Sequence, residues 1–336
     1  MKFTQVTNQD ISINVAVEGS GPLIVCVHGW PELWYSWRHQ LEYFSQRGYT
    51  VAALDVRGYG KSSKPDDVAS YSLKELTSDV AAVVRSLSDD GAILIGHDWG
   101  APIVWNTALL YPNLIRAVAG LSVPYIPGSD RAFIDVASEL YADQFFYQIY
   151  FQEKGKAESE LEADIPTALR KIYYAISGDA PSDDWLKHKP KEASLLDGMI
   201  DPNPFPEWLT PDDLHIYSQA FEAGGFTGPL NRYRAQRIDV DELTAIRGKK
   251  IEQPAYFIGG AKDAVRHFVS GLDMYANPGI ACLDFRGSTI IENAGHWVQQ
   301  EAPRETNEAL DSFLKSLYKD TAITRLLNRN CHMGWE

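Results

Sequence analysis

A carboxylate occupies the position at which a hydrolytic nucleophile would be expected. Gly96-His97-Asp98-Trp99-Gly100 follows a short apolar run from Ala92 and precedes a helical pattern. This spacing is typical of a nucleophile elbow, a sharp strand-to-helix turn that exposes its central side chain. An aspartate attacks esters poorly, but it can displace a leaving group at an sp3 carbon and form an alkyl ester on the protein. The alternative is that Asp98 only caps its helix.

A second segment could supply the oxyanion hole that such chemistry needs. His28-Gly29-Trp30-Pro31-Glu32 follows another buried strand pattern. In hydrolases, one backbone donor comes from such a loop and the other from the residue after the nucleophile. We therefore assign the oxyanion hole to the backbone N–H groups of Trp30 and Trp99, and a structural role in the loop to His28.

The third element of the site lies late in the chain. Asp263 follows the apolar run that starts at Pro254, and His296 follows the run that starts at Thr289. Either residue alone would be ordinary, an aspartate in a turn or a histidine on the surface or in the core. The order of nucleophile, acid and histidine matches that of hydrolase triads. Strand ends at one edge of a sheet would bring the three side chains together.

The segments that position these residues alternate between strand and helix patterns. Helical spacing is present in residues 34–47 and 72–87, and the final helix carries Leu310, Phe313, Leu314 and Leu317. Such alternation predicts a mostly parallel sheet that is covered by helices on both faces. Apolar runs that fit buried strands start at Ile11, Pro22, Thr50, Ala92, Ala117, Pro254 and Thr289.

The alternation is interrupted in the middle of the chain. Residues 128–246 contain no comparable strand pattern; their periodic stretches are helical, and residues 177–211 have the composition of a long loop. We therefore predict a core formed by residues 1–127 and 247–319, with a helical cap of residues 128–246 inserted in it. Residues 320–336 have no clear period and are predicted to form a C-terminal tail.

Together, the motifs resemble those of the soluble epoxide hydrolases of the α/β-hydrolase superfamily. The resemblance covers nearly the whole chain except the tail, and it rests on GHDWG, on HGWPELWYSWRHQ from His28, on RGYGKSSKP from Arg57 and on NAGHW. It implies an α/β-hydrolase fold with an inserted cap, in which Asp98 is the nucleophile and His296 and Asp263 activate water. It also implies that neither a cofactor nor a metal is needed.

Two segments of the cap resemble those that carry ring-opening tyrosines in this family. FYQIYFQ from Phe146 and GPLNRYR from Gly228 map these residues to Tyr147 and Tyr233. Two phenol O–H groups could hold an epoxide oxygen and protonate it as the ring opens. Plain packing is the alternative in a chain with seventeen tyrosines, and Tyr150 competes with Tyr147. Family members often have Trp where this chain has Arg232, so the lining of the pocket departs from the family there.

The predicted activity is the hydrolysis of an epoxide by water to a vicinal diol, through an ester on Asp98. We expect Trp30, Trp99, Tyr150 and Trp297 to line the substrate pocket. A haloalkane dehalogenase would use the same triad, but halide leaves without a proton, so the two tyrosines would have no role. A non-catalytic ligand-binding homologue would have no need of an intact nucleophile, acid and base.

Composition limits the partners and the compartment. The 336 residues include 45 acidic and 31 basic side chains, a formal net charge of −14, and such a surface repels nucleic acid. No apolar segment is long enough for a membrane helix, and the N-terminal residues lack a signal-peptide pattern. Cys26, Cys282 and Cys331 have no metal-type spacing. We therefore expect a cytoplasmic protein, either a monomer or a homodimer.

Overall fold

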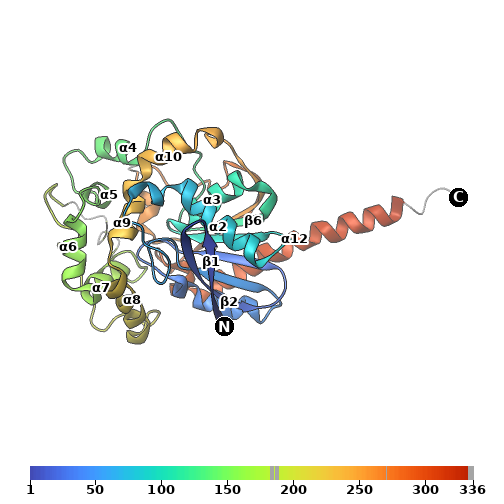
Figure 1. Ribbon diagram of the computed structural model, residues 1–336, viewed down its shortest axis with the longest axis horizontal. Helices are drawn as coiled ribbons and strands as arrows, with labels where there is room; N and C mark the ends of the chain where they lie inside the picture. The colour runs from blue at the N-terminus through green and yellow to red at the C-terminus, as the bar shows by residue number, and fades with distance from the viewer. Residues whose placement is uncertain (182–184, 186–188, 270, 332–336) are drawn as a thin grey trace.

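A twisted eight-stranded sheet lies at the centre of the molecule (Figure 1). The computed structural model describes residues 1–181, 185, 189–269 and 271–331. The strand order is β1-β2-β4-β3-β5-β6-β7-β8; β2 is antiparallel to β1 and β4, and every other neighbouring pair is parallel. The strands are β1 (Lys2–Asn8), β2 (Ile11–Gly19), β3 (Leu23–Val27), β4 (Thr50–Leu54), β5 (Ala92–His97), β6 (Ile115–Leu121), β7 (Ile251–Gly260) and β8 (Cys282–Ile291).

The central strands are apolar on both faces because helices cover both faces. Within β5, Leu94 belongs to one apolar cluster, whereas Ile93 and Ile95 belong to another on the opposite face. This explains the continuous apolar runs in the sequence. The helices of the core are η1 (Trp34–Trp37), α1 (Arg38–Ser45), η2 (Val68–Tyr71), α2 (Leu73–Leu87), α3 (Gly100–Leu110), η3 (Pro112–Leu114), η5 (Ala264–His267), α11 (Val298–Glu301) and α12 (Pro303–Cys331).

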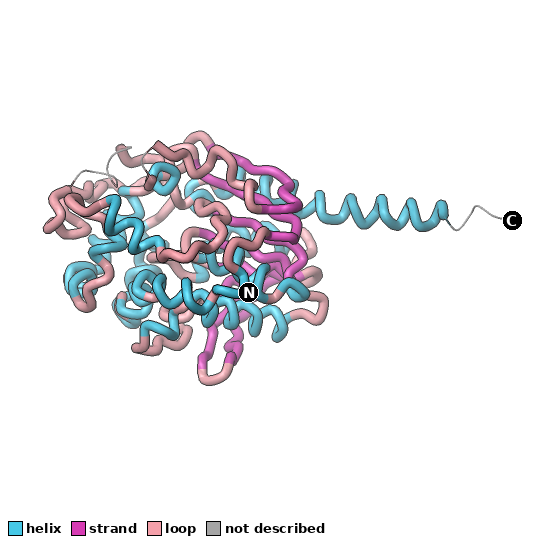
Figure 2. Tube along the Cα trace, turned by 90° about the horizontal axis from the view of Figure 1, so that it is seen from above, coloured by secondary structure: helices cyan, strands magenta, loops and turns pink. Residues whose placement is uncertain are grey.

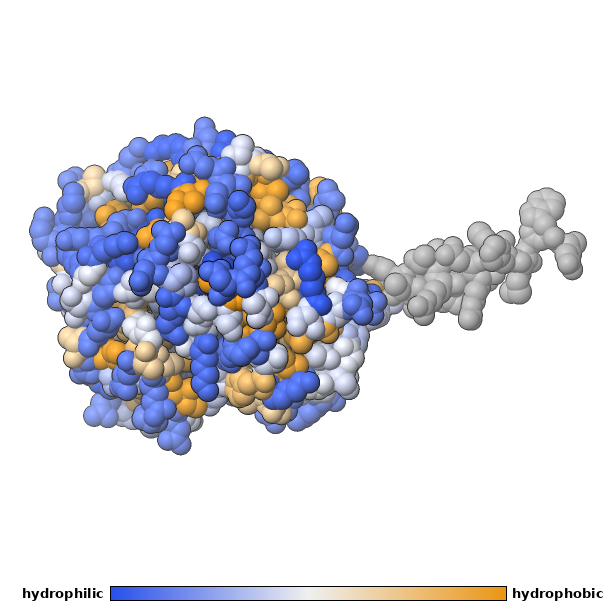
Figure 3. Space-filling model, in the orientation of Figure 1, coloured by the Kyte–Doolittle hydropathy of each residue, from blue (hydrophilic) through white to orange (hydrophobic). Residues whose placement is uncertain are grey.

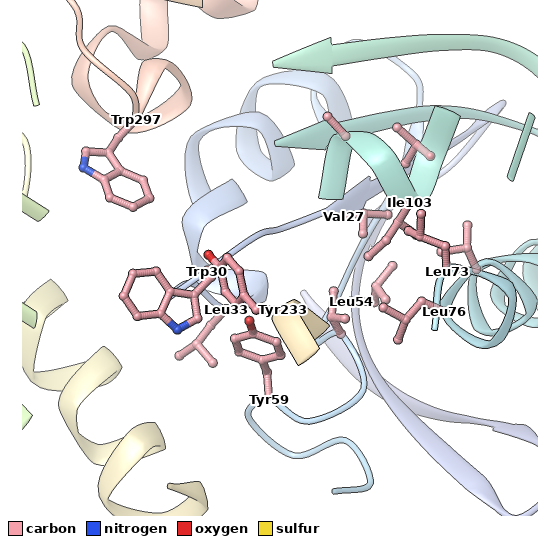
Figure 4. Packing of buried hydrophobic residues seen from close by; sticks show 14 of the residues in the cluster. Val27, Trp30, Leu33, Leu54, Tyr59, Leu73, Leu76, Ile103, Tyr233 and Trp297 are labelled. Carbon is pink, nitrogen blue, oxygen red and sulfur yellow. The ribbon is translucent and has the colours of Figure 1, made fainter. Parts of the chain in front are cut away.

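Between β6 and β7 the chain leaves the sheet and forms helices. Figure 2 shows these helices gathered at the end of the molecule that lies away from α12. Their apolar side chains share one cluster with the core, in which Trp30 lies near Tyr233 (Figure 4). The proposed cap bounds, residues 128–246, agree with this arrangement but stay a prediction. The helices are α4 (Phe133–Leu140), α5 (Tyr147–Tyr150), α6 (Lys156–Ala163), α7 (Ile165–Ala175), α8 (Pro211–Gly224), α9 (Thr227–Arg234), α10 (Gln236–Glu242) and η4 (Thr244–Ile246).

The two ends of the chain differ from the expectation. The first strand, β1, was not predicted; it is an edge strand whose side chains are mostly exposed, so it lacks a clear alternation. Helix α12 continues to Cys331, through most of the range assigned to the tail, and extends away from the sheet (Figure 1). The rest of the predicted tail, residues 332–336, lies outside the described residues.

The surface is mostly polar on the face that Figure 3 shows, where apolar residues form separate small patches. Within the described part of the chain, no helix combines the length and the apolar character needed to cross a membrane.

Candidate active site

Asp98 sits on a tight turn between β5 and α3. Its φ of 50° lies in the left-handed region that side chains rarely adopt. Its N–H donates to the carbonyl oxygen of Leu121 on the neighbouring strand, at 3.3 Å. A Cβ atom on Gly96 would overlap the carbonyl oxygen of Gly100, and one on Gly100 would overlap that of Val27. The two glycines of the motif therefore permit the turn, which raises Asp98 above the carboxyl ends of the strands.

Each oxygen of the Asp98 carboxylate has a partner. Oδ1 accepts the N–H of Trp30 at 2.8 Å, and Oδ2 lies 3.4 Å from Nε2 of His296. Burial would raise the pKa of Asp98, but His296, His97 and the Trp30 N–H together hold this pKa below its ordinary value. Asp98 is therefore ionised at neutral pH, the form that a nucleophile needs.

A second carboxylate, that of Asp263, holds His296 on the side of the ring that faces away from Asp98. Its Nδ1 lies 2.9 Å from Oδ2 of Asp263. Asp263 also accepts the N–H of Val265 at 2.8 Å and the hydroxyl of Tyr275 at 2.7 Å. Because Nδ1 faces Asp263, Nε2 is the nitrogen directed at Asp98. Asp98, Asp263 and His296 follow β5, β7 and β8, and the parallel strands bring them to one edge of the sheet.

The two carboxylates determine the protonation of His296. Burial alone would lower the pKa of this histidine, whereas Asp263 and Asp98 raise it, and the net result is a pKa well above the ordinary value. A cationic His296 between two anionic carboxylates is therefore the resting arrangement.

The loop after β3 lies directly against Asp98. A Cβ atom on Gly29 would overlap the Asp98 carboxylate, so this position requires glycine. The Trp30 N–H is bound to Asp98, and the Trp99 N–H lies at the start of α3, where the first amides of a helix have no acceptor within it. His28 holds the loop: its Nδ1 lies 2.8 Å from the Gly29 carbonyl oxygen, and its Nε2 accepts the N–H of Val56 at 3.0 Å.

A buried pair behind the site was not anticipated from the sequence. Nδ1 of His97 lies 2.7 Å from Oε2 of Glu32, which also accepts the Gly29 N–H at 2.9 Å. Nε2 of His97 lies 2.8 Å from the carbonyl oxygen of His296. The pair thus links the oxyanion loop, the elbow and the histidine loop. Both residues stand inside motifs that the sequence analysis recognised, but their contact spans 65 positions and has no periodic signal.

The two predicted cap tyrosines lie close together, facing the core. Tyr147 begins α5 and Tyr233 lies in α9, with ring centroids 5.9 Å apart, and the Tyr233 ring is 5.3 Å from that of Trp99. Burial and the nearby Asp98 raise the pKa of Tyr147, and burial raises that of Tyr233 well above its ordinary value. Both phenols therefore keep their protons at neutral pH, so each can donate a hydrogen bond.

A largely apolar cavity of about 370 Å³ opens beside Asp98, and this volume is ample for a small organic molecule. Asp98, Trp99, Tyr147 and Gln148 form part of its wall, and the remaining wall is almost entirely apolar. The other lining residues are Pro102, Val123, Ile126, Phe133, Val136, Leu140, Gln236, Val265, Phe268, Val269, Leu272 and Met274.

Of the four residues predicted to line the substrate pocket, Trp99 lines this cavity, whereas Trp30, Tyr150 and Trp297 do not. The Tyr150 hydroxyl donates to Glu160 at 2.8 Å, and Tyr150 lines a separate cavity. Trp297 is 0% exposed, so it offers no surface to a substrate, and its indole N–H donates to the Tyr173 carbonyl oxygen at 2.8 Å. The Trp30 ring packs against that of Tyr233, with centroids 6.0 Å apart (Figure 4).

Arg232, where the chain departs from the family pattern, is a buried cation with its own counter-ion. It pairs with Asp239 and donates to the carbonyl oxygen of Tyr71. Its guanidinium lies 4.8 Å from the centroid of the Trp99 ring. Asp239 therefore neutralises the charge of Arg232 close to the Trp99 ring. The Tyr233 ring still lies against that of Trp99.

Comparison with known proteins gives consistent results. The alpha/beta hydrolase fold family matches residues 22–303. The chain is 37% identical over 330 residues to "Epoxide hydrolase B" of Mycobacterium tuberculosis, with 88% of this chain and 92% of that protein covered. It is 37% identical over 309 residues to "Epoxide hydrolase A" of the same organism, with 90% and 93% covered. A solved epoxide hydrolase from an endophytic Streptomyces superimposes with a TM-score of 0.90 at 40% identity, covering 95% of this chain and 96% of that one.

Proposed function

We propose that this chain, which belongs to the alpha/beta hydrolase fold family and within it to the epoxide hydrolases, hydrolyses epoxides to vicinal diols. One observation carries the chemistry: an ionised carboxylate, Asp98, stands at the elbow within 3.4 Å of a histidine that a second carboxylate holds. A carboxylate at this position favours attack on an sp3 carbon over acyl transfer.

The first half-reaction forms an ester. Tyr147 and Tyr233 donate hydrogen bonds to the epoxide oxygen, and one of them gives it a proton as the ring C–O bond breaks. An Asp98 oxygen forms the new C–O bond, which leaves a hydroxyalkyl ester. The two tyrosine rings lie near each other, with centroids 5.9 Å apart, and burial together with the charge of Asp98 raises the pKa of both phenols, which supports a role for both beside the carboxylate.

The second half-reaction hydrolyses this ester. His296, oriented by Asp263, removes a proton from water, and the resulting hydroxide attacks the carbonyl carbon of Asp98. The N–H groups of Trp30 and Trp99 stabilise the oxyanion. The bond between this carbon and the alkyl oxygen then breaks, and His296 returns its proton to the leaving diol. Asp98 is left as a carboxylic acid, and its proton restores the tyrosine that protonated the epoxide oxygen. One oxygen of the first diol therefore comes from Asp98, and one oxygen of water remains on Asp98.

We expect wild-type protein to convert an aryl epoxide such as styrene oxide to its diol and to release no halide from a 1-haloalkane, because two phenols are donors suited to an oxygen that takes up a proton rather than to a halide. The measurement is product analysis by gas chromatography, together with a single turnover in H₂¹⁸O followed by mass spectrometry. The first diol should lack ¹⁸O, and the label should be found on the peptide that contains Asp98.

Other outcomes would move the protein to another class. A labelled diol in the first turnover would mean direct attack by water without an ester. Halide release without diol would indicate a dehalogenase, and tight binding without turnover would indicate a ligand-binding protein.

The two half-reactions should respond differently to acid. His296, His97 and the Trp30 N–H lower the pKa of Asp98 by more than burial raises it. Asp98 therefore stays ionised as the pH falls. Ester formation removes the Asp98 charge, one of the two that raise the pKa of His296, so neutral histidine becomes available. Acid protonates it again. We expect ester formation to change less than about threefold between about pH 8 and 5.5, and ester hydrolysis to fall by about tenfold per pH unit below its inflection.

Stopped-flow tryptophan fluorescence in single-turnover mode can separate the two rates. An equal acid dependence of both rates, or none in the hydrolysis, would contradict the assignment of His296 as the base.

A further inference from the structure

Glu301, at the end of α11, is a carboxylate with three backbone donors and no part in the proposed chemistry. Its Oε2 accepts the N–H of Gly178 at 2.7 Å and that of Gly295 at 2.9 Å. Its Oε1 accepts the N–H of Trp297 at 2.8 Å. Two of these donors flank His296 in the sequence, and the third belongs to the segment that follows α7 in the cap. One side chain thus joins the catalytic histidine loop to the cap.

The two backbones joined by Glu301 lie against each other. The N–H of His296 donates to the carbonyl oxygen of Ile176 at 2.9 Å, and Nζ of Lys262 donates to that of Gly178 at 2.9 Å. A Cβ atom on Gly295 would overlap the Gly178 nitrogen. We call this contact between residues 176–178 and 295–297 the cap–histidine seam. Close packing makes the seam sensitive to the loss of a single acceptor.

We propose that Glu301 is a positioning residue for ester hydrolysis, holding His296 through the cap–histidine seam. The inference rests on the proposed function. Ester formation depends on Asp98, which the elbow and the Trp30 N–H hold in place independently of Glu301, while its second oxygen lies 3.4 Å from Nε2 of His296. Hydrolysis depends on the direction of Nε2 of His296 towards a water molecule, and a displacement of about 1 Å can lower a rate by about a hundredfold.

An ionised Glu301 fits three donors, but a protonated one does not, because one oxygen then carries a hydrogen. Burial raises the pKa of Glu301 to about 7, against the Gly295, Gly178 and Trp297 N–H groups, which lower it. The charged groups near the carboxylate are Asp263, which raises the pKa further, Lys262, which binds the carbonyl of Gly178, and His296. Acid should therefore loosen the seam as the pH falls through about 7.

The decisive variant is Glu301→Gln, which keeps the shape but turns an NH₂ group towards at least one backbone N–H. We expect ester hydrolysis to slow by about 10- to 100-fold, while ester formation changes by less than about threefold. Because the ester then accumulates, kcat and KM should fall together and kcat/KM should stay nearly constant. Single-turnover fluorescence and steady-state kinetics measure these quantities. The matched control is Glu292→Gln. Glu292 is an exposed glutamate on the loop that carries His296, and this variant should behave as wild type.

The pH dependence provides a readout that simple destabilisation would not change. The ratio of wild-type to Glu301→Gln hydrolysis rates should be largest above pH 7 and shrink towards pH 6, since wild type then protonates its own Glu301. Equal slowing of both half-reactions, or a ratio independent of pH, would overturn the inference.

A second variant, Glu301→Asp, tests the same role if Glu301→Gln does not fold. The charge is retained but the carboxylate is drawn back by roughly 1.5 Å, so hydrolysis should again slow selectively. Unchanged hydrolysis in a folded Glu301→Asp variant would overturn the inference. If wild type forms no ester, the proposed function itself fails, whereas an ester whose hydrolysis ignores Glu301 defeats only the role of this residue.

Discussion

His296→Asn should stop turnover and leave the enzyme trapped as an ester on Asp98. Ester formation needs the Asp98 carboxylate and the tyrosine protons, and neither is removed by the substitution. Hydrolysis needs a base beside the ester, and asparagine cannot accept a proton from water. We expect kcat to fall by at least about 10³-fold, as for the loss of a base in other covalent hydrolases. Intact-protein mass spectrometry should show one added epoxide mass per chain, located on the peptide that contains Asp98.

A surface histidine gives the control for this experiment. His215, on α8, is exposed, so His215→Asn should keep wild-type turnover and accumulate no adduct. A His296→Asn variant that folds but acquires no adduct would show either that attack on the epoxide needs His296 or that Asp98 is not the nucleophile. The sequential scheme would then be wrong.

Much of the core could be predicted because its strands and helices leave a signal in short stretches of sequence. Strands covered on both faces must be apolar throughout, and the runs at Ala92 and Thr50 therefore indicated β5 and β4. β1 was missed because an exposed edge strand carries no such signal. The C-terminal range was assigned to a tail because periodicity weakens after Leu317, yet helix α12 continues to Cys331.

The positions of Asp98, Asp263 and His296 were predictable for a different reason. Each follows a buried strand directly, and the order along the chain limits where parallel strands can bring them. The residues behind them carry no such signal. Glu32, His97 and Glu301 act through hydrogen bonds to residues distant in sequence or to backbone amides, and neither appears as a pattern.

The cap shows where side-chain direction cannot be inferred from spacing. Tyr147 and Tyr150 are three positions apart in α5, a helix of four residues, and helical spacing alone would put both near one face of the helix. In the structure, Tyr147 lines the cavity beside Asp98, while Tyr150 turns to Glu160. A partner supplied by another helix, α6, decided the direction.

This divergence makes Tyr150 a control for the prediction with the largest expected effect. The double variant Tyr147→Phe/Tyr233→Phe should lose diol formation by at least about 10⁴-fold, and each single variant should lose about 10- to 10³-fold. Tyr150→Phe should stay within about threefold of wild type. Each of the three substitutions removes one phenol hydroxyl group. Only the position of that hydroxyl can therefore account for different outcomes.

The physical basis of the loss is the charge on the departing oxygen. In water an alkoxide is a poor leaving group; in an apolar cavity it is poorer still, unless a donor stabilises it as the charge develops. The raised pKa values of Tyr147 and Tyr233 keep both protons in place for this purpose. The loss should therefore appear in the rate of ester formation, measured by single-turnover fluorescence, and any ester that the variant does form should hydrolyse at the wild-type rate.

The same variant separates the epoxide hydrolase from its closest chemical rival. Halide needs no proton to leave, so a dehalogenase would keep its activity when both phenols are lost. Halide release from a 1-haloalkane that survives in Tyr147→Phe/Tyr233→Phe, with diol formation absent from wild type, would therefore assign the cavity to haloalkanes. Diol formation that survives in the double variant would instead mean that another acid, or water in the cavity, protonates the epoxide oxygen, and the pairing of two cap phenols across the nucleophile would be packing alone.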